Sequence, residues 1–370
     1  MNKLHIAVFG HKTIPSRSGG VEVAAAQLAI RMAALGHQVT CYNRGGRKTA
    51  FYEGICLKPA PAVPIKGLAA VSSSFFAALA AAFSSADVCH IHAEGPALMC
   101  FLPKLAGKRV IVTVHGLDWQ REKWRGSIGV YYIRMGEKMA VRFADEIIVL
   151  NRQTQQYFRQ RYGRDTHLIP NGVETPRILP PKLISERFGL QKNGYILYVG
   201  RLVPEKGIHD LIRAFRELPT QKRLVIAGAS SDTAAYAVYL RDLAAGDPRI
   251  LFTGFVEGQL LEELYSNAFL YVLPSHLEGM PLSLLEAMSY GNCCVISGIP
   301  GSTDAAGGHA LTFPAANTAA LRDALRRLCD DEALRQQHRS SARNRVRDHF
   351  SWDEITRKTL ELYHENSAHS

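Results

Sequence analysis

Short apolar runs alternate with longer amphipathic stretches through the first half of the chain. Residues 4–10, LHIAVFG, have the pattern of a buried strand, and residues 21–35 repeat apolar positions at helical spacing until Gly36 ends them. The strand-like runs that follow are at residues 38–43, 88–92, 109–114 and 146–150. Strands that alternate with helices in this way predict βαβ units and therefore a parallel sheet.

A second series of the same kind occupies the other half of the chain. Periodicity lapses at residues 170–183, where four prolines indicate a linker. Strand-like runs then recur at residues 195–200, 223–228, 250–255, 269–274 and 293–297, and helices fill the C-terminal end. The chain has 370 residues, more than the roughly 100 to 200 of one domain. We therefore predict two doubly wound α/β domains, whose ligands bind beyond the carboxyl ends of the strands.

The alanine-rich stretch at residues 67–86 has about the length of a membrane span, but it contains five serines. Phe76, Leu79, Ala80 and Phe83 recur in it at helical spacing. This spacing favours a helix that buries the phenylalanine side in a domain core. A helix that rests on a membrane surface is the alternative.

Composition is that of an ordinary folded protein, with 47% hydrophobic and 21% charged residues. The seven cysteines form no C-x-x-C pair, which is typical of buried thiols in a reducing compartment. The first residues enter a strand pattern directly, without the pattern of a signal peptide. These features predict a cytoplasmic protein.

The positive charge is concentrated in the first half of the chain. The formal charge is +11, and residues 1–175 hold 22 of the 44 Lys and Arg but only 11 of the 33 Asp and Glu. Such asymmetry indicates an anionic substrate or an anionic membrane face, or else a solvated basic surface that keeps the protein soluble. No recognition-helix, zinc-finger or aromatic-basic signature is present, so we expect no nucleic-acid partner.

Two glutamates flank a Gly-Met-Pro corner in the stretch HLEGMPLSLLEAMSYG, residues 276–291. Pro281 suits the first position of a helix that ends at Gly291, so Glu278 lies in the loop before it. Glu286 lies on the helix face opposite the apolar side. Amides at a helix start attract phosphate, and carboxylates accept hydrogen bonds from hydroxyls. The pattern predicts a diphosphate site with a sugar ring at one end and a ribose at the other.

The stretch GRLVPEKG supplies cations for the same anion. Arg201 follows a predicted strand, and Lys206 precedes the next helix. A guanidinium and an ammonium together can neutralise the charge that develops on a leaving diphosphate. The chain has no Asp-x-Asp motif and no run of His, Cys or carboxylates with ligand spacing, so we expect neither a metal nor another cofactor.

In the first domain, Gly19 and Gly20 follow the first strand and precede a helix, where backbone amides can approach phosphate or sugar. The loop is not a G-x-G-x-x-G, which disfavours a redox dinucleotide. His115 ends another predicted strand, a position that is compatible with a catalytic role and with a structural one.

The stretches GRLVPEKG and EGMPLSLLE together resemble the retaining family-four glycosyltransferases of GT-B architecture. The first-domain runs IPSRSGGVE, YEGI and HGLDWQREKW further resemble a bacterial rhamnosyltransferase-like branch. The resemblance implies two facing Rossmann-like domains: an N-terminal acceptor-side domain at residues 1–175 and a nucleotide-sugar domain at residues 176–350. It also implies a closing helix at residues 351–370 that returns to the first domain.

The resemblance also implies roles for individual residues. Arg201 and Lys206 would hold the donor diphosphate, Glu278 the hydroxyls of the donor sugar, and Glu286 the ribose. Gly19 and Gly20 match the loop near the diphosphate, and His115 matches the residue that approaches the donor sugar. The donor-binding residues implied between the glutamates are Gly279, Met280, Pro281, Leu282 and Ser283, and those implied near the base are Phe255 and Val256.

The function implied is transfer of a hexose, with rhamnose as one candidate, from a UDP- or dTDP-sugar to a glycan or lipid-linked acceptor, with retention at the anomeric carbon. The setting implied is cell-surface polysaccharide synthesis at the inner face of the cell membrane. A glycoside hydrolase would use the two glutamates but needs no diphosphate grip. A nucleotide-sugar epimerase and a non-catalytic sugar-nucleotide-binding protein remain alternatives.

Overall fold

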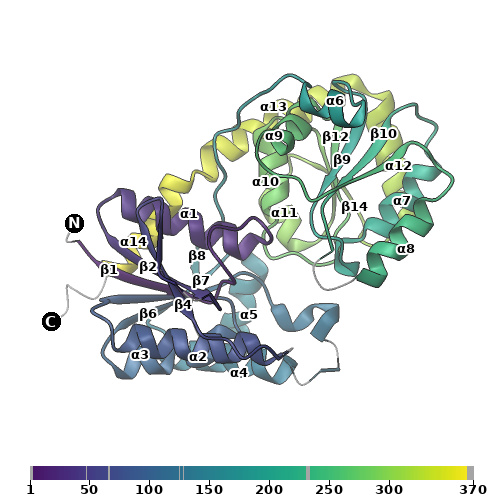
Figure 1. The fold of residues 1–370 in the computed structure, drawn as a ribbon. Coiled ribbons are helices and arrows are strands. Elements are labelled where there is room, and N and C mark those ends of the chain that lie inside the picture. Colours follow the sequence, from purple (N-terminus) through teal and green to yellow (C-terminus); the bar gives the residue numbers. More distant parts are fainter. Residues whose placement is uncertain are drawn as a thin grey trace. The chain divides into compact units, whose positions relative to one another are not determined.

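The chain forms two compact α/β units in a computed structural model (Figure 1). The structure describes residues 3–46, 48–65, 67–124, 126–127, 129–230 and 234–364. The first unit comprises the described residues up to Asn171 together with those from Trp352 onward, and the second unit runs from Gly172 to Ser351. The chain therefore leaves the first unit once and returns to it at its C-terminal end.

The first unit is built on an eight-stranded sheet. Its strands are β1 (His5–Phe9), β2 (Gln38–Arg44), β3 (Ala50–Tyr52), β4 (Ile55–Ala60), β5 (Val88–His92), β6 (Arg109–Val114), β7 (Glu146–Val149) and β8 (His167–Leu168). Their order is β3-β4-β2-β1-β5-β6-β7-β8, and all neighbours are parallel except β3 and β4. The order reverses at β1, which makes the carboxyl ends of β1 and β5 the topological switch point of this unit.

Helices cover both faces of this sheet. They are α1 (Gly20–Ala34), α2 (Leu68–Ala82), α3 (Phe101–Leu105), α4 (Gly129–Phe143), α5 (Arg152–Tyr162) and α14 (Trp352–His364). Helix α14 packs on α1, where Asp353 pairs with Arg31 at 3.0 Å. The rest of the predicted closing segment, residues 365–370, lies outside the described residues. Local signals define α5 at both ends, since the Asn151 side chain accepts the Thr154 amide at 2.8 Å and Gly163 has a φ of 62°.

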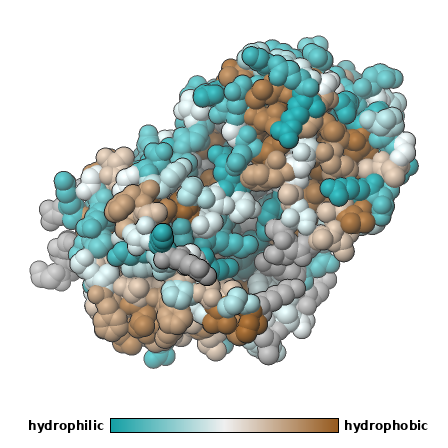
Figure 2. All heavy atoms as spheres, viewed as in Figure 1, coloured by the Kyte–Doolittle hydropathy of each residue, from teal (hydrophilic) through white to brown (hydrophobic). Residues whose placement is uncertain are grey.

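The prediction for residues 67–86 was right about a helix but wrong about its buried face. Helix α2 buries Ala77, Ala78 and Ala81, whereas Phe76 is 41% exposed and Phe83 is 84% exposed. Small side chains let a helix approach a sheet closely, and α2 contacts β1, β2 and β4. The phenylalanines are left on the surface. Figure 2 shows hydrophobic atoms gathered over the part of the first unit where Figure 1 labels α2 and α3.

Among the described residues, every helix is too short or too polar to cross a membrane.

The second unit is built on a six-stranded parallel sheet. Its strands are β9 (Tyr195–Val199), β10 (Arg223–Ala227), β11 (Ile250–Gly254), β12 (Leu270–Leu273), β13 (Cys294–Ser297) and β14 (Leu311–Phe313). The order is β11-β10-β9-β12-β13-β14. The chain adds β10 and β11 on one side of β9 and then continues on its other side with β12. The switch point of this unit therefore lies between β9 and β12.

The helices of the second unit lie on both faces of its sheet (Figure 1). They are α6 (Leu183–Phe188), α7 (Ile208–Arg216), α8 (Ala234–Ala244), α9 (Gly258–Asn267), α10 (Leu282–Ser289), α11 (Pro300–Ala306), α12 (Thr318–Asp330) and α13 (Glu332–His349). The core between strands and helices holds four fully buried tyrosines, Tyr195, Tyr198, Tyr265 and Tyr271. A buried phenol requires a hydrogen-bond partner. Tyr195 donates to the carbonyl of Leu264 at 2.7 Å, which ties β9 to α9.

Candidate active site

Two loops meet at the switch point of the second unit. One follows β9 and contains the short turn Pro204–Lys206, and the other follows β12 and leads into α10. The amide of His276 donates to the carbonyl of Glu205 at 2.8 Å. Gly207 has a φ of +63°, and a Cβ on it would lie 2.1 Å from the carbonyl oxygen of Pro274. Only glycine fits there, so the two loops pack backbone against backbone.

This packing brings Lys206 and Glu278 together. The Lys206 ammonium nitrogen lies 2.5 Å from Oε1 of Glu278, and the Ser275 hydroxyl donates to the same oxygen at 2.6 Å. The Lys206 and Glu278 side chains are only 15% and 9% exposed. Two residues that lie far apart in the sequence thus form a nearly buried ion pair at the position where a doubly wound domain binds its ligand.

Two buried tyrosines connect this pair to Arg201 and Glu286. Burial, with Tyr271 and Glu278 nearby, holds the pKa of Tyr198 well above its usual value, and Arg201 acts against this rise. Burial also holds the pKa of Tyr271 well above its usual value, with further contributions from Glu278 and Glu286. Tyr198 additionally donates to the carbonyl of Arg201 at 3.1 Å. Arg201, Glu278 and Glu286 are therefore among the charges that act on this pair of neutral phenols.

Helix α10 begins one residue later than predicted. Pro281 is its N-cap, with a ψ of 108° that is extended rather than helical, and no side chain caps the helix. Tyr265 donates to Glu286 at 3.0 Å, and Tyr271 donates to Ser283 at 2.8 Å, so both polar side chains are oriented by the core. Of the residues between the glutamates, Met280 and Pro281 are buried, and Gly279, Leu282 and Ser283 are half-buried.

The loop that carries Glu278 also rests on the next helix. A Cβ on Gly301, at the start of α11, would lie 2.3 Å from the carbonyl oxygen of Glu278 and 2.6 Å from that of Gly279. The backbone around Glu278 and Gly279 is therefore packed against the start of α11 as well as against the loop after β9.

Phe255 and Val256 lie further away from the ion pair. They follow β11, which is separated from β9 by β10. Phe255 is 52% exposed, and Val256 is 9% exposed. Their predicted role near the base stays a prediction.

In the first unit, the carboxylate of Glu22 packs against the loop that contains Gly19. Gly19 is the N-cap of α1, and Gly20 is the first helical residue rather than a residue before the helix. The buried side chain of Glu22 accepts the amide of Lys12 at 3.1 Å, and its Oε2 would lie 2.4 Å from a Cβ on Gly19. Glu22 was not predicted as a site residue, although it adjoins the glycines in SGGVE.

His115 belongs to a cluster of four buried histidines in the first unit. Its Nε2 lies 2.9 Å from Nδ1 of His92, and the ring of His92 lies 4.3 Å from that of His90. His90 contacts Thr113 and Tyr363 at 2.6 Å each. His11, which interacts electrostatically with His92, lies 3.0 Å from the amide oxygen of Asn43. The sequence did not reveal this cluster because its members come from β5 and from the segments after β1 and β6, which only the sheet order brings together.

Burial keeps these imidazoles neutral. It lowers the pKa of His115 and of His11 to about 4 and that of His90 to about 3, and it lowers the pKa of His92 as well. A neutral His115 can donate or accept a hydrogen bond but carries no positive charge at pH 7. His92 and His115 also line a small cavity whose wall includes Asn171, Trp352 and Thr359.

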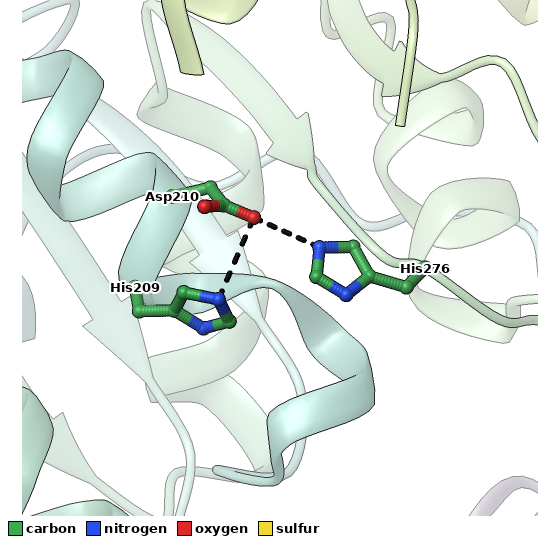
Figure 3. Close-up of side chains that lie close together, drawn as sticks. All are labelled: His209, Asp210 and His276. Carbon is green, nitrogen blue, oxygen red and sulfur yellow. Dashed lines mark hydrogen bonds and ion pairs between the residues drawn. The ribbon is translucent and has the colours of Figure 1, made fainter. Parts of the chain in front are cut away.

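A second group of polar side chains lies beside the motif loops of the second unit. His209 and Asp210 begin α7, and His276 lies two residues before Glu278. The three side chains converge, and their ligand atoms lie within 4.8 Å of one another (Figure 3). Although burial alone would raise the pKa of Asp210, the hydrogen bond from His276 and the two imidazoles hold it below its usual value. This group was not predicted from the sequence, because its members do not follow ligand spacing.

Two family models divide this chain between them. Residues 18–177 match the model described as Glycosyltransferase Family 4, and residues 182–345 match the model described as Glycosyl transferases group 1. The chain belongs to the glycosyltransferases. This confirms the family predicted from the two motifs at its coarser level.

Curated relatives of this glycosyltransferase include an uncharacterized glycosyltransferase of Methanocaldococcus jannaschii, 33% identical over 174 residues, 45% of this chain and 44% of the relative. Glycogen synthase of Mycobacterium tuberculosis is 29% identical over 296 residues, 75% of this chain and 68% of the relative. The first alignment thus covers less than half of that relative.

Solved structures confirm the predicted fold class, two Rossmann-like domains of GT-B type. Sucrose-phosphate synthase from Thermosynechococcus elongatus has a TM-score of 0.83 and 23% identity, and the match covers 100% of both chains. HepE of Anabaena in complex with UDP-glucose has a TM-score of 0.81 and 17% identity, covering 98% of this glycosyltransferase and 100% of that chain. At these identities the likeness shows the fold alone.

We expect Gly207→Ala to disturb the second unit and its ion pair. The new Cβ would clash with the Pro274 carbonyl, and φ would be unfavourable for alanine, so the loops must separate. The expected loss is at least about 1 kcal/mol of unfolding free energy, measured by urea unfolding followed through tyrosine signals. Gly246→Ala is a control with a φ of +84° and open space around its Cβ. Equal losses of unfolding free energy in the two variants would show that the contact with Pro274 does not contribute to stability.

We expect the first unit to lose stability as the pH falls from about 6.5 toward 4. Unfolded histidines take up protons near pH 6.5, whereas the buried ones stay neutral to about pH 4. Each then contributes a loss of up to about 1.4 kcal/mol per pH unit. All three tryptophans, Trp119, Trp124 and Trp352, lie in the first unit, so urea unfolding followed by tryptophan fluorescence at pH 7 and pH 5 measures it.

The variant His90→Asn removes one of the buried imidazoles and should reduce this pH difference. His5→Asn, which replaces a half-buried histidine on the same sheet, serves as the control. An unchanged pH difference in His90→Asn would contradict the assignment of the proton uptake to the buried cluster.

Proposed function

We propose that this glycosyltransferase moves a hexose from a nucleoside diphosphate sugar, with UDP or dTDP as the nucleotide, to a hydroxyl group of a glycan or lipid-linked acceptor. Transfer proceeds with retention at the anomeric carbon, and rhamnose is one candidate sugar. The observation that carries this proposal is the Lys206 and Glu278 ion pair at the switch point of the second unit. The UDP-glucose named for HepE is the kind of donor that such a site would bind.

The diphosphate is proposed to bind where two loops and a helix start converge. The first amides of α10 lack a side-chain cap and attract an anion. Lys206 supplies a point charge, and Arg201 supplies a planar fork for phosphate oxygens. When the diphosphate binds, Lys206 exchanges part of its contact with Glu278 for phosphate. The carboxylate is thereby released to accept hydrogen bonds from sugar hydroxyls.

Glu286 is proposed to bind the ribose. Its carboxylate accepts a hydrogen bond from the Tyr265 phenol, which holds it in one orientation. In this proposal the Glu278 carboxylate lies at one end of the diphosphate and the Glu286 carboxylate at the other.

The chemistry asked of the protein is mainly electrostatic. A nucleoside diphosphate is a good leaving group, and what limits its departure is the charge that develops on its oxygens. Preorganised cations stabilise that charge without reorganisation at the moment of reaction. No step of this proposal requires a metal ion or another cofactor at the reacting atoms.

The acceptor is proposed to be anionic and presented at the inner face of the cell membrane, as part of a cell-surface polysaccharide. The support is the basic excess of residues 1–175 and the exposed phenylalanines of α2. Positive charge attracts anionic lipid, and exposed aromatic side chains insert at the level of the headgroups.

We expect Lys206→Ala and Arg201→Ala each to lower the rate of sugar transfer by about 10²- to 10³-fold, the usual effect of removing one charge-stabilising donor. The measurement is release of nucleoside diphosphate with a panel of UDP- and dTDP-sugars, with and without acceptor. Arg326→Ala, an exposed arginine on α12 that pairs with Asp330, is the matched control. Near-normal turnover in both site variants would end this mechanism.

The same assay separates the alternatives. An epimerase would convert the nucleotide sugar without any acceptor and without releasing nucleotide, and a binding protein would raise its melting temperature with a donor but turn none over. Donor binding that survives in Lys206→Ala with full affinity would place the diphosphate elsewhere.

We expect the chain to bind vesicles that contain anionic lipid at low salt and to dissociate as the salt concentration rises. Phe83→Ser together with Phe76→Ser should weaken this binding about tenfold, because inserted aromatic area is lost. Val238→Ser, at a residue of the second unit that is 54% exposed, is the control. Co-sedimentation that is insensitive to salt, or absent at low salt, would contradict membrane contact.

A further inference from the structure

The group formed by His209, Asp210 and His276 has the composition and the convergence of a metal site. Nε2 of His276 lies 2.8 Å from Oδ2 of Asp210, and Nε2 of His209 lies 3.6 Å from the same oxygen. All three ligand atoms lie within 4.8 Å of one another. Figure 3 shows both imidazole rings turned toward the carboxylate, one from α7 and one from the loop after β12.

The two separations that involve the carboxylate oxygen are close to those that a tetrahedral ion imposes. Zinc binds histidine nitrogen and carboxylate oxygen at about 2.0 to 2.2 Å, so neighbouring ligand atoms lie about 3.3 to 3.5 Å apart. The distances of 2.8 and 3.6 Å lie on either side of this value. Small side-chain rotations would therefore suffice to admit the ion, and the backbone could stay in place.

Outer contacts orient two of the three ligands. The hydroxyl of Tyr236 lies 2.8 Å from Nδ1 of His209, and the Thr318 hydroxyl donates to Oδ1 of Asp210 at 3.3 Å. Histidines that bind metals commonly use their second nitrogen in this way, because the contact fixes the ring and its tautomer. Both outer contacts use atoms other than those that face the centre of the group.

The surroundings allow an ion to enter and leave room for a further ligand. The side chains of His209 and His276 are 21% and 32% exposed, whereas that of Asp210 is 8% exposed. A nearly buried carboxylate needs compensating charge. The Arg213 guanidinium lies 3.9 Å from the other oxygen, Oδ1, and not from the Oδ2 that faces the two imidazoles.

The simpler interpretation is a hydrogen-bonded pair of His276 and Asp210. The first unit contains such a pair, His167 and Glu146, at 2.7 Å. The second-unit group differs from it in having another imidazole whose far nitrogen is held by a tyrosine. A hydrogen bond between His276 and Asp210 needs neither His209 nor the contact of His209 with Tyr236. A metal site needs His209 as its third ligand, and the Tyr236 contact would orient that ligand.

We propose that His209, Asp210 and His276 bind one Zn²⁺ ion, with a water molecule as the fourth ligand. Two imidazoles and one carboxylate suit a borderline ion such as zinc better than a hard ion such as Mg²⁺. The ion joins the start of α7, immediately after Lys206 and Gly207, to the loop that carries Glu278. Its role is structural, because it fixes the two loops of the donor site.

The test is a zinc titration of the chelator-treated full chain by calorimetry, with metal content measured after dialysis. We expect one ion per chain, a higher melting temperature with zinc, and no equivalent effect of Mg²⁺. Co²⁺ in place of zinc should give the visible absorption of a four-coordinate nitrogen and oxygen site. Absence of stoichiometric zinc uptake by the wild-type chain would overturn the proposal.

Variants assign the ligands. H209Q, D210N and H276Q should each weaken zinc binding at least tenfold, and Y236F, which keeps all three ligands, should weaken it about 10- to 100-fold. H167Q, in the two-member pair of the first unit, should bind zinc as the wild type does. Unchanged zinc affinity in the double variant H209Q/H276Q would overturn the assignment. These readouts do not depend on sugar transfer, so a failure here is distinct from a failure of the proposed function.

Discussion

The ion pair between Lys206 and Glu278 is the interaction on which the second unit's site depends. Its two charges are nearly buried, and a buried charge that loses its partner is costly, so each residue stabilises the position of the other. The pair forms only because β9 and β12 are neighbours and Gly207 allows the loops to touch. Helix start, cation and carboxylate are therefore in place before any ligand arrives, and binding needs little rearrangement.

The two units have the same kind of switch point but place different side chains there. Each has its switch point beside the first strand of its own sheet, at β1 and at β9. Neutral, buried imidazoles lie beside β1, and Glu22 lies in the first turn of α1, whereas the loops after β9 and β12 carry the ion pair and the half-buried Arg201. The nearly buried ion pair thus lies in the second unit, although the whole net positive charge belongs to the first half of the chain.

The sequence predicted the doubly wound architecture because strands such as β1 and β9 are continuous apolar runs between helical repeats. It also predicted the charged residues near the switch point, since they adjoin strand ends and a helix start. It could not place His92 or the His209 group, because these contacts join positions that only the sheet order brings together. Nor did it show that Glu22 would fold back onto the loop before its own helix. The buried face of α2 was predicted wrongly because the large phenylalanine side chains were expected to be buried. In the structure the helix packs closely on the sheet, and small side chains such as alanine fit between them. Short strands such as β14, three residues long, have too few positions to show a period.

The buried imidazoles of the first unit have a consequence for its electric field. Four of the fourteen histidines, His11, His90, His92 and His115, hold no proton until the medium becomes strongly acidic. These four side chains therefore add nothing to the positive potential around this unit at neutral pH, and lysine and arginine, whose charge is constant across the pH range of living cells, supply most of it. Salt, which screens those charges, is a variable that would change how strongly this unit attracts an anion.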